Sequence, residues 1–260
     1  MNAQQVLKYH EKLKNYLAHY LPLWQEISDY MIPRQNSIST ILPPGSTRMK
    51  AYDSTAIVSN DDLGNFINKN RTSMAMQWFT LRVGRETERE KLIDKEGEMW
   101  LEDCQEREFE ALRASNFSSE IQELYSDWPS FGIGSIYLEE KDIKKRGFNG
   151  FNFYCLAPGT YCVEWGIDGM PHCLFREFDL TAQVAFDRWG NNVGEKIKGY
   201  LERDPFHDCR FVHAVFPSDW FGGAHKTTME YVSYYIDTES KKKVEEGGYP
   251  EFPFAVVPWK

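Results

Sequence analysis

The sequence lacks any apolar run approaching the roughly 20 residues that a membrane-spanning helix requires. Charged residues or prolines interrupt each run within a few positions. The N-terminus, MNAQQVLKYHEKLKNY, also lacks the basic segment followed by an apolar segment that marks a secretory signal. These two absences predict a soluble protein with neither a membrane span nor a secretory signal.

Cysteine is scarce, and its count is odd. The five cysteines are Cys104, Cys155, Cys162, Cys173 and Cys209. Sparse, unpaired cysteines in a sizeable chain favour reduced thiols in a cytosol-like compartment over a disulfide framework.

The sequence has no G-x-x-x-x-G-K-[ST] phosphate-binding loop. The pair Gly132-x-Gly134 lacks the remaining glycine of a dinucleotide-binding fingerprint, and it precedes a predicted strand instead of following one. Nucleotide hydrolysis by this chain is therefore not expected. There is also no internal repeat.

The composition is that of a folded protein. Hydrophobic residues make up 42% of the 260 residues and aromatic residues 15%, a content that disordered chains do not reach. Lys and Arg number 30 and Asp and Glu number 39, which gives a net charge of −9. This charge excludes a broadly cationic surface for nucleic acid, so any DNA contact must be local.

The first half of the chain has helical periodicity. Apolar residues from Val6 to Met31 trace one helical face, within which Pro22 predicts either a kink or a second helix that begins near it. Further helices are predicted over 56–72, over 88–115, and over 118–128 with Pro129 as the stop. Residues 78–83 alternate like a short strand.

The second half changes to strand periodicity. Strands are predicted over 135–140, 150–156, 161–165 and 173–178 as an antiparallel meander. Thr181 is expected to cap a helix that ends at Trp189, and a further helix is predicted over 195–201, with strands over 211–216 and 229–236. The chain is thus expected to be α+β, with a mainly helical region at 1–132 and an antiparallel β-rich region at 133–260.

One group of residues resembles an enzyme site. His207, Cys209 and His213, with His172-Cys173 upstream, carry the imidazole and thiol groups that bind zinc or act as nucleophiles. The spacing matches no paired zinc signature, and strand alternation places Cys209, Phe211 and His213 on one side, where ordinary packing accounts for them. A metal-dependent or thiol hydrolase remains the alternative from another functional class.

Two basic clusters could contact phosphate or an acidic partner. The first, Lys141, Lys144, Lys145 and Arg146, is expected on an exposed hairpin between the strands at 135–140 and 150–156. The second is Lys241 to Lys243. Hairpin tips commonly carry solvated lysines, so a solubilising role is the simpler interpretation.

A series of short strings, in one order along the chain, resembles the head-to-tail connector or portal proteins of short-tailed, T7-like bacteriophages. No single string is specific, whereas about ten in the same order are. In chain order they are Trp24-Gln25-Glu26-Ile27 with Tyr30 and Ile32-Pro33-Arg34, Tyr52-Asp53-Ser54-Thr55-Ala56, Trp78-Phe79-x-Leu81, Ser115-Asn116-Phe117 with Glu123-x-Tyr125-x-Asp127, Phe131-Gly132-x-Gly134, Ala157-Pro158-Gly159, Asp168-Gly169, Arg176-Glu177-Phe178, Leu180-Thr181-Ala182-Gln183 with Trp189-Gly190, His213-Ala214-Val215-Phe216-Pro217, and Gly248-Tyr249-x-Glu251-Phe252-Pro253.

The resemblance implies a structural virion protein without catalytic, cofactor or metal residues. It implies a homo-oligomeric ring, usually of twelve subunits, at one capsid vertex, through which double-stranded DNA passes non-specifically. The implied partners are capsid protein, scaffolding protein, terminase and tail adaptor proteins, with assembly in the host cytoplasm and no membrane. This chain would form the N-terminal, wing-like part, followed by a stem that it does not contain. Another virion adaptor or collar protein is the further alternative.

Two stretches depart from the family pattern. Residues 65–76 are rich in Asn, Lys and Arg where the family has small apolar residues, and the ending Pro258-Trp259-Lys260 replaces a Pro-Arg-Trp-like sequence. The apolar, proline-containing end also indicates a truncated chain, since a domain terminus is usually solvated. An acidic chain suits a passive DNA conduit, because acidic walls repel phosphate and leave few attachments for a sliding duplex.

Overall fold

A computed structural model describes residues 3–33, 38–39, 52–82, 95–141, 147–220 and 229–258. The chain forms two compact units, one made of Met1–Tyr52 with Leu156–Val256 and the other of Asp53–Cys155 with Val257–Lys260. Helices and antiparallel sheets occur in both, which confirms the α+β class. The division into a helical region at 1–132 and a β-rich region at 133–260 stays a prediction.

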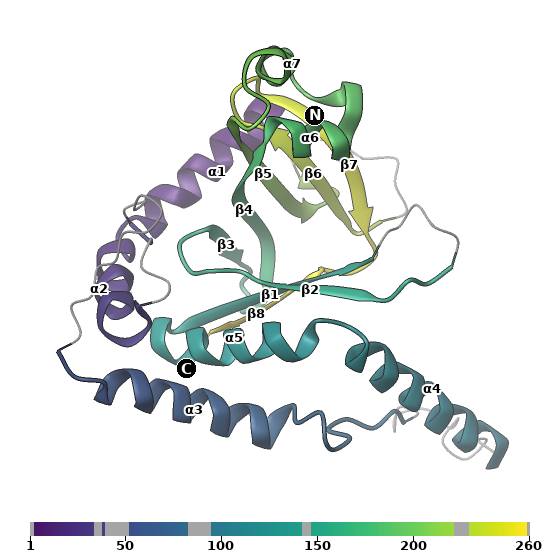
Figure 1. Cartoon of the computed structure of the whole chain (residues 1–260). Helices are drawn as coiled ribbons and strands as arrows, with labels where there is room; N and C mark the ends of the chain where they lie inside the picture. Colours follow the sequence, from purple (N-terminus) through teal and green to yellow (C-terminus); the bar gives the residue numbers. More distant parts are fainter. Residues whose placement is uncertain are drawn as a thin grey trace. The chain divides into compact units, whose positions relative to one another are not determined.

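The first unit is built around a five-stranded antiparallel sheet with helices on both faces (Figure 1). Its strands follow the order β3-β4-β5-β6-β7, so each strand pairs with its neighbours in the sequence. Its elements are α1 (Ala3–Leu17), α2 (Leu21–Met31), β3 (Tyr161–Trp165), β4 (Pro171–Thr181), α6 (Ala182–Trp189), the 3-10 helix η3 (Gly190–Asn192), α7 (Glu195–Arg203), β5 (Asp208–Pro217), β6 (Tyr231–Asp237) and β7 (Lys242–Tyr249).

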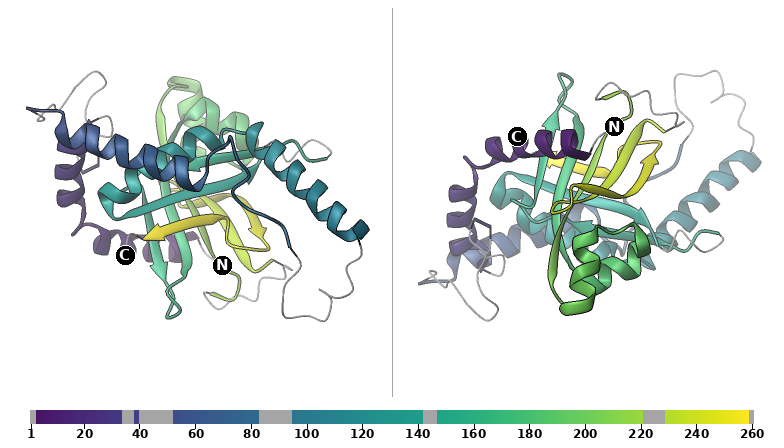
Figure 2. Two further views of the ribbon diagram at one scale, coloured as in Figure 1. Left: turned by 90° about the horizontal axis from the view of Figure 1, so that it is seen from below. Right: turned by 90° about the horizontal axis from the view of Figure 1, so that it is seen from above.

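Period-two alternation along β5 gives the sheet two buried faces. Val212 and Phe216 pack with Val6 and Leu13 of α1, whereas Cys209 and Phe211 pack beneath α6 and α7. Figure 2 shows α1 on one face of the sheet and α6 with α7 on the other. Both faces are covered, so β5 is buried at every position from Phe211 to Phe216.

Local sequence signals set several boundaries as predicted. Pro22 lies in the first turn of α2, where a missing N–H costs no helical hydrogen bond, and α1 and α2 are therefore separate helices. Thr181 caps α6 by accepting a hydrogen bond from the Val184 N–H.

The second unit contains the longer helices. Its elements are α3 (Thr55–Arg71), α4 (Lys95–Arg113), α5 (Phe117–Phe131), β1 (Ile133–Glu140) and β2 (Phe151–Cys155). β1 and β2 form an antiparallel hairpin, and β8 (Phe254–Pro258), where the chain passes from the first unit into the second, completes a sheet of order β2-β1-β8. The core of this unit includes Phe117, Ile121 and Leu124 of α5 with Ile136 and Phe153 of the hairpin.

Helices α3 and α5 approach closely at Gly64. A Cβ atom at this position would lie 3.1 Å from the carbonyl oxygen of Tyr125. Pro129, four residues after Tyr125, has no N–H to bond that carbonyl.

The prediction that the helix stops at Pro129 was wrong, because the helix continues to Phe131 and ends at Gly132 with φ of 76°.

The strand predicted over 78–83 was also wrong for its described residues. Trp78 and Phe79 pack on Phe109 of α4, with ring centroids of Phe79 and Phe109 4.3 Å apart. The Leu81 N–H donates to the Gln105 side chain at 3.0 Å, so a helix side chain takes the place of a strand partner. Val83 and residues 88–94 of the predicted fourth helix lie outside the described residues.

The meander predicted over 135–178 is two hairpins in two different sheets. β1 pairs with β2 and β3 pairs with β4, while β2 and β3 belong to separate sheets. The last two strands, β7 and β8, were not predicted. Over the described part of the chain, none of the helices combines the length and apolarity needed to cross a membrane.

Candidate functional site

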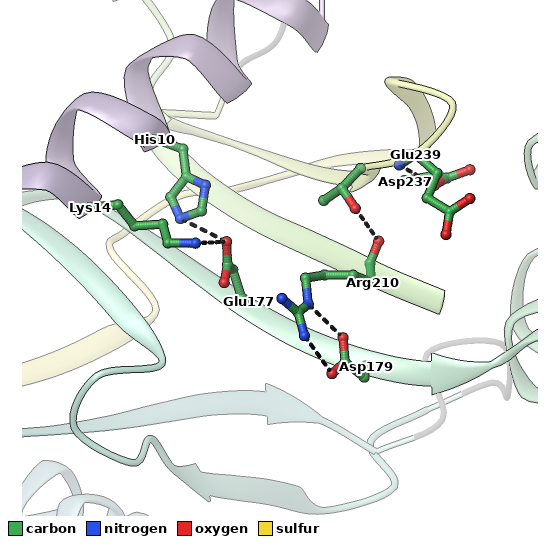
Figure 3. A network of polar contacts seen from close by, with 8 residues as sticks. His10, Lys14, Glu177, Asp179, Arg210, Asp237 and Glu239 are labelled. Carbon is green, nitrogen blue, oxygen red and sulfur yellow. Dashed lines mark hydrogen bonds and ion pairs between the residues drawn. The ribbon is translucent and has the colours of Figure 1, made fainter. Parts of the chain in front are cut away.

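A cluster of charged side chains in the first unit lies between α1 and the β4–β5 strands. His10 and Lys14, one helical turn apart on α1, converge on Glu177 of β4 (Figure 3). The Lys14 Nζ lies 2.9 Å from Glu177 Oε1, and the His10 Nε2 lies 3.8 Å from the same oxygen. The cluster joins residues 163 positions apart in the sequence, and the sequence offered no signal for it.

His10 is a buried imidazole. Only 2% of the residue is exposed, and its ring stacks on Phe175 at 5.7 Å. Burial lowers the pKa of His10, and the opposing influence of Glu177 does not overcome it. His10 is therefore neutral near pH 7, and Lys14 provides the positive charge that balances Glu177.

A second ion pair continues the cluster along the same strands. Arg210 of β5 donates two hydrogen bonds to Asp179 of β4, at 2.9 and 3.1 Å, and these residues are directly opposite in the β4–β5 register. The Asp179 carboxylate raises the pKa of Arg210. Thr238 donates from its hydroxyl to the Arg210 carbonyl at 2.9 Å. These two parallel hydrogen bonds hold the side chains of Arg210 and Asp179 in fixed orientations.

A groove of about 550 Å³ opens beside this cluster. Lys8 and Lys241 line it together with His10, Glu11 and Glu177. Among the described residues, Lys241 is the one non-glycine at positive φ, at 52°. The donor atoms of His10, Glu11 and Glu177 lie within 4.8 Å of one another, a spacing that a metal ion could use. Lys14 already supplies a cation to Glu177, which opposes binding of a metal there.

The predicted basic cluster is only partly described. Lys141 follows β1, is half-buried, and donates its backbone N–H to the Gly150 carbonyl at 2.8 Å. The antiparallel pairing of β1 with β2 confirms the predicted hairpin between these two strands. Lys144, Lys145 and Arg146 lie outside the described residues, so their role in phosphate or partner contact stays a prediction. Lys241 belongs to the groove, and Lys243 pairs with Glu246.

The structure does not assemble His207, Cys209 and His213 into one site. The His207 ring stacks on Tyr200, whereas the Cys209 thiol donates to the His207 carbonyl. Burial and nearby carboxylates raise the pKa of Cys209 to about 11, so a thiolate is disfavoured. Cys209 and His213 lie four residues apart on one strand, about 13 Å at the rise of an extended chain.

His213 is a fully buried structural residue. Its Nδ1 accepts a hydrogen bond from the Arg176 Nε–H at 3.1 Å, and its Nε2 lies 2.9 Å from the Ser233 hydroxyl. Because Nδ1 accepts, Nε2 carries the proton and donates to Ser233. The ring stacks flat on Tyr235 at 4.1 Å. Burial, reinforced by Arg176 and Arg188, lowers the pKa of His213 well below its ordinary value.

Comparison with known proteins identifies the family to which the chain belongs. A family model described as bacteriophage head to tail connecting protein matches residues 3–260, so the chain belongs to this family. The portal protein of Salmonella phage epsilon15 is 24% identical over 268 residues, an alignment that covers 99% of this chain and 46% of that protein. The chain thus spans about half the length of this curated relative. The resemblance indicated by the ordered strings is confirmed.

Proposed function

We propose that this chain is the N-terminal part of a portal subunit, which assembles into a ring at one vertex of the capsid. Double-stranded DNA would enter through the ring during packaging and leave through it during ejection, and the tail would attach to it. The family match over residues 3–260 carries this proposal, and the portal protein of epsilon15 supports it.

The proposed ring has about twelve subunits. Its partners are the capsid protein, the scaffolding protein, the terminase and the tail adaptor proteins, and it is assembled in the host cytoplasm. In this proposal residues 1–132 form the helical part of the wing and residues 133–260 form its β-rich part, followed by a stem in the longer subunit.

We further propose that the chain itself catalyses no reaction. Two observations support this. Burial raises the pKa of Cys162 to about 12 and that of Cys209 to about 11, which keeps these thiols protonated and unreactive. His213 uses both ring nitrogens in structural hydrogen bonds. The net charge of −9 separately supports the proposed passage of DNA, since DNA would slide along such a surface without lasting attachment.

Electron microscopy and native mass spectrometry of the full-length protein test the proposal. We expect closed rings of one stoichiometry that bind the terminase. Monomers alone under capsid-assembly conditions would contradict the ring, and rings that join only tail proteins would identify a collar or adaptor instead. Zinc analysis tests the hydrolase alternative, since a metal retained after dialysis against chelator and lost in Cys209→Ser would contradict the non-catalytic role.

A further inference from the structure

The C-terminal half of α4 is packed against described residues, whereas its N-terminal half carries exposed apolar side chains. In the packed half, Phe109 is 1% exposed against Phe79, and Gln105 binds the backbone of Leu81. In the N-terminal half of α4, Met99 is 60% exposed and Trp100 is 64% exposed. Figure 2 shows this end of α4 projecting from α5 and the hairpin of its own unit. Two large apolar side chains on a projecting helix are typical of a protein contact surface.

The same helix is strongly acidic. It carries seven carboxylates and three basic residues, and all seven carboxylates are exposed. They are Glu96, Glu98, Glu102, Asp103, Glu106, Glu108 and Glu110. A partner for this surface must therefore be positively charged and must offer apolar or aromatic area to Met99 and Trp100.

The outward face of α1 has this complementary character. Val6, His10 and Leu13 face the sheet, which leaves Lys8, Lys12 and Tyr16 exposed on the other side of the helix. Tyr16 is 61% exposed, and the Lys12 ammonium lies 6.0 Å from the centre of its ring. α1 contains three lysines and one glutamate, and Lys241 adds a further positive charge at the groove that Lys8 also lines.

We propose that, in the assembled ring, the first half of α4 of one copy packs against the outward face of α1 of the next copy. This rests on the proposed ring. Glu96 and Asp103, which share one face of α4 with Met99 and Trp100, face Lys8 and Lys12, while Trp100 and Met99 pack on Tyr16 and on the lysine alkyl stems. A head-to-tail contact between two different surfaces of one chain is the kind that closes into a ring.

A second copy fits these surfaces better than DNA does. Phosphate would be attracted to α1 and repelled by α4, whereas a copy of this chain offers a partner to both. Two turns of helix bury less than the roughly 800 Å² per partner of a standard interface. The α1–α4 contact is therefore one part of a larger subunit interface, and its charges set the register between neighbours.

Charge reversal with rescue tests the contact in the full-length protein. We expect Lys8→Glu with Lys12→Glu to abolish ring assembly at concentrations where the wild type assembles, and Glu96→Lys with Asp103→Lys, on the face of α4 that carries Met99 and Trp100, to do the same. The chain that carries all four substitutions should recover rings, because the pairs become opposite in sign again. Trp100→Ala should also reduce the ring yield. Lys69→Glu with Arg71→Glu on α3 makes the same charge change elsewhere and should leave assembly unchanged.

The outcomes separate this contact from the ring itself. Undiminished rings in the Lys8 and Lys12 variant would overturn the contact and leave the ring standing, whereas absence of rings in the wild type would refute the proposed function. Failure of the fourfold variant to assemble, with both double variants folded by circular dichroism, would also overturn the contact. Normal rings from the Lys8 and Lys12 variant that fail to package DNA would assign the α1 lysines to phosphate instead.

Discussion

Asn116 makes two hydrogen bonds with the backbone of Phe153, one in each direction. Its Nδ2 donates to the Phe153 carbonyl at 2.7 Å, and its Oδ1 accepts from the Phe153 N–H at 2.8 Å. Phe153 lies on β2, the edge strand of its sheet, and the side chain of Asn116 therefore acts as one residue of a missing neighbour strand. Glu120 extends the arrangement by accepting from the Cys155 N–H at 2.7 Å.

Replacement of Asn116 by Ala should destabilise the chain by about 1–3 kcal/mol, because two backbone groups of a half-buried strand lose their partner. Asn116→Asp should cost at least as much, since it removes the donor and places a carboxylate against the Phe153 carbonyl. Urea denaturation measures the change in free energy of unfolding. Asn70→Ala, which removes one exposed side-chain hydrogen bond on α3, is the control and should change stability little. Equal effects at the two positions would contradict the role of Asn116.

Two glycines in helices should respond in opposite ways to substitution. Gly64→Val should destabilise the chain by about 1–3 kcal/mol, because a Cβ there would lie 3.1 Å from the backbone oxygen of Tyr125 and the valine methyl groups need more room. Gly199→Ala in α7 should stabilise it by about 0.5–1 kcal/mol, since no atom lies within 4 Å of the added Cβ and alanine favours the helix. Thermal unfolding of both variants checks the pair, and destabilisation by Gly199→Ala would count against this account.

His213 should make stability decline in mild acid. Its folded pKa is lowered below the ordinary value of 6.5, so the unfolded chain takes up the proton first as the pH falls. The stabilisation that neutral His213 gives to the folded chain is complete above about pH 6.5. Below that pH the free energy of unfolding decreases by at most about 1.4 kcal/mol per pH unit. Denaturant titrations at pH 8, 6 and 5 should show a steeper loss in the wild type than in His213→Gln. Parallel curves would refute this assignment.

The Glu177 carboxylate should hold the pKa of His10 above the value that burial alone would give. Glu177→Gln removes the opposing charge, and the pKa of His10 should then fall further, as followed by NMR of the imidazole carbons. Asp179→Asn provides the control on the same strand, because Asp179 pairs with Arg210 instead. An unchanged or raised His10 pKa in Glu177→Gln would show that the two groups do not interact.

The basic hairpin should be dispensable for packaging. Substitution of Lys141, Lys144, Lys145 and Arg146 by Gln should leave assembled rings able to package DNA at the wild-type rate, because exposed charges at a hairpin tip add little to stability and the loop is expected to lie outside the channel. If the loop contacts DNA, the substitution would instead flatten the salt dependence by about one unit of slope per lost phosphate contact. A packaging defect in correctly assembled rings would contradict the expectation.

Local features of the fold could be predicted from the sequence, since one or two residues determine them. Pro22 indicated either a kink or the start of a second helix, and the second alternative was correct. Thr181 identified the cap of α6, and alternation identified most strands. β7 was missed because KKVEEGGY is charged and glycine-rich, which are features of an edge strand that hide its period. Pro129 was misread because a proline near the end of a helix removes one hydrogen bond without ending the helix.

Long-range features could not be predicted. Whether β2 and β3 share a sheet depends on which segments fold together, and no local pattern contains that information. The His10–Glu177 cluster joins residues on α1 and β4, and in the sequence His10 only continues an apolar face with Val6 and Leu13. Alternation along β5 did predict, correctly, that Cys209 and Phe211 would pack on one face.

The path of the chain through its two units also determines an order of events at the ribosome. α1 emerges first, yet Glu177, which Lys14 binds, is synthesised 163 residues later. At 5–20 residues per second this delay is roughly 8 to 33 s, far longer than hydrophobic collapse takes. Most of the second unit, residues 53–155, leaves the ribosome within this interval and can fold first. The apolar face of α1 therefore remains without its sheet during this interval, and a chaperone that covers this face would protect the nascent helix from incorrect contacts.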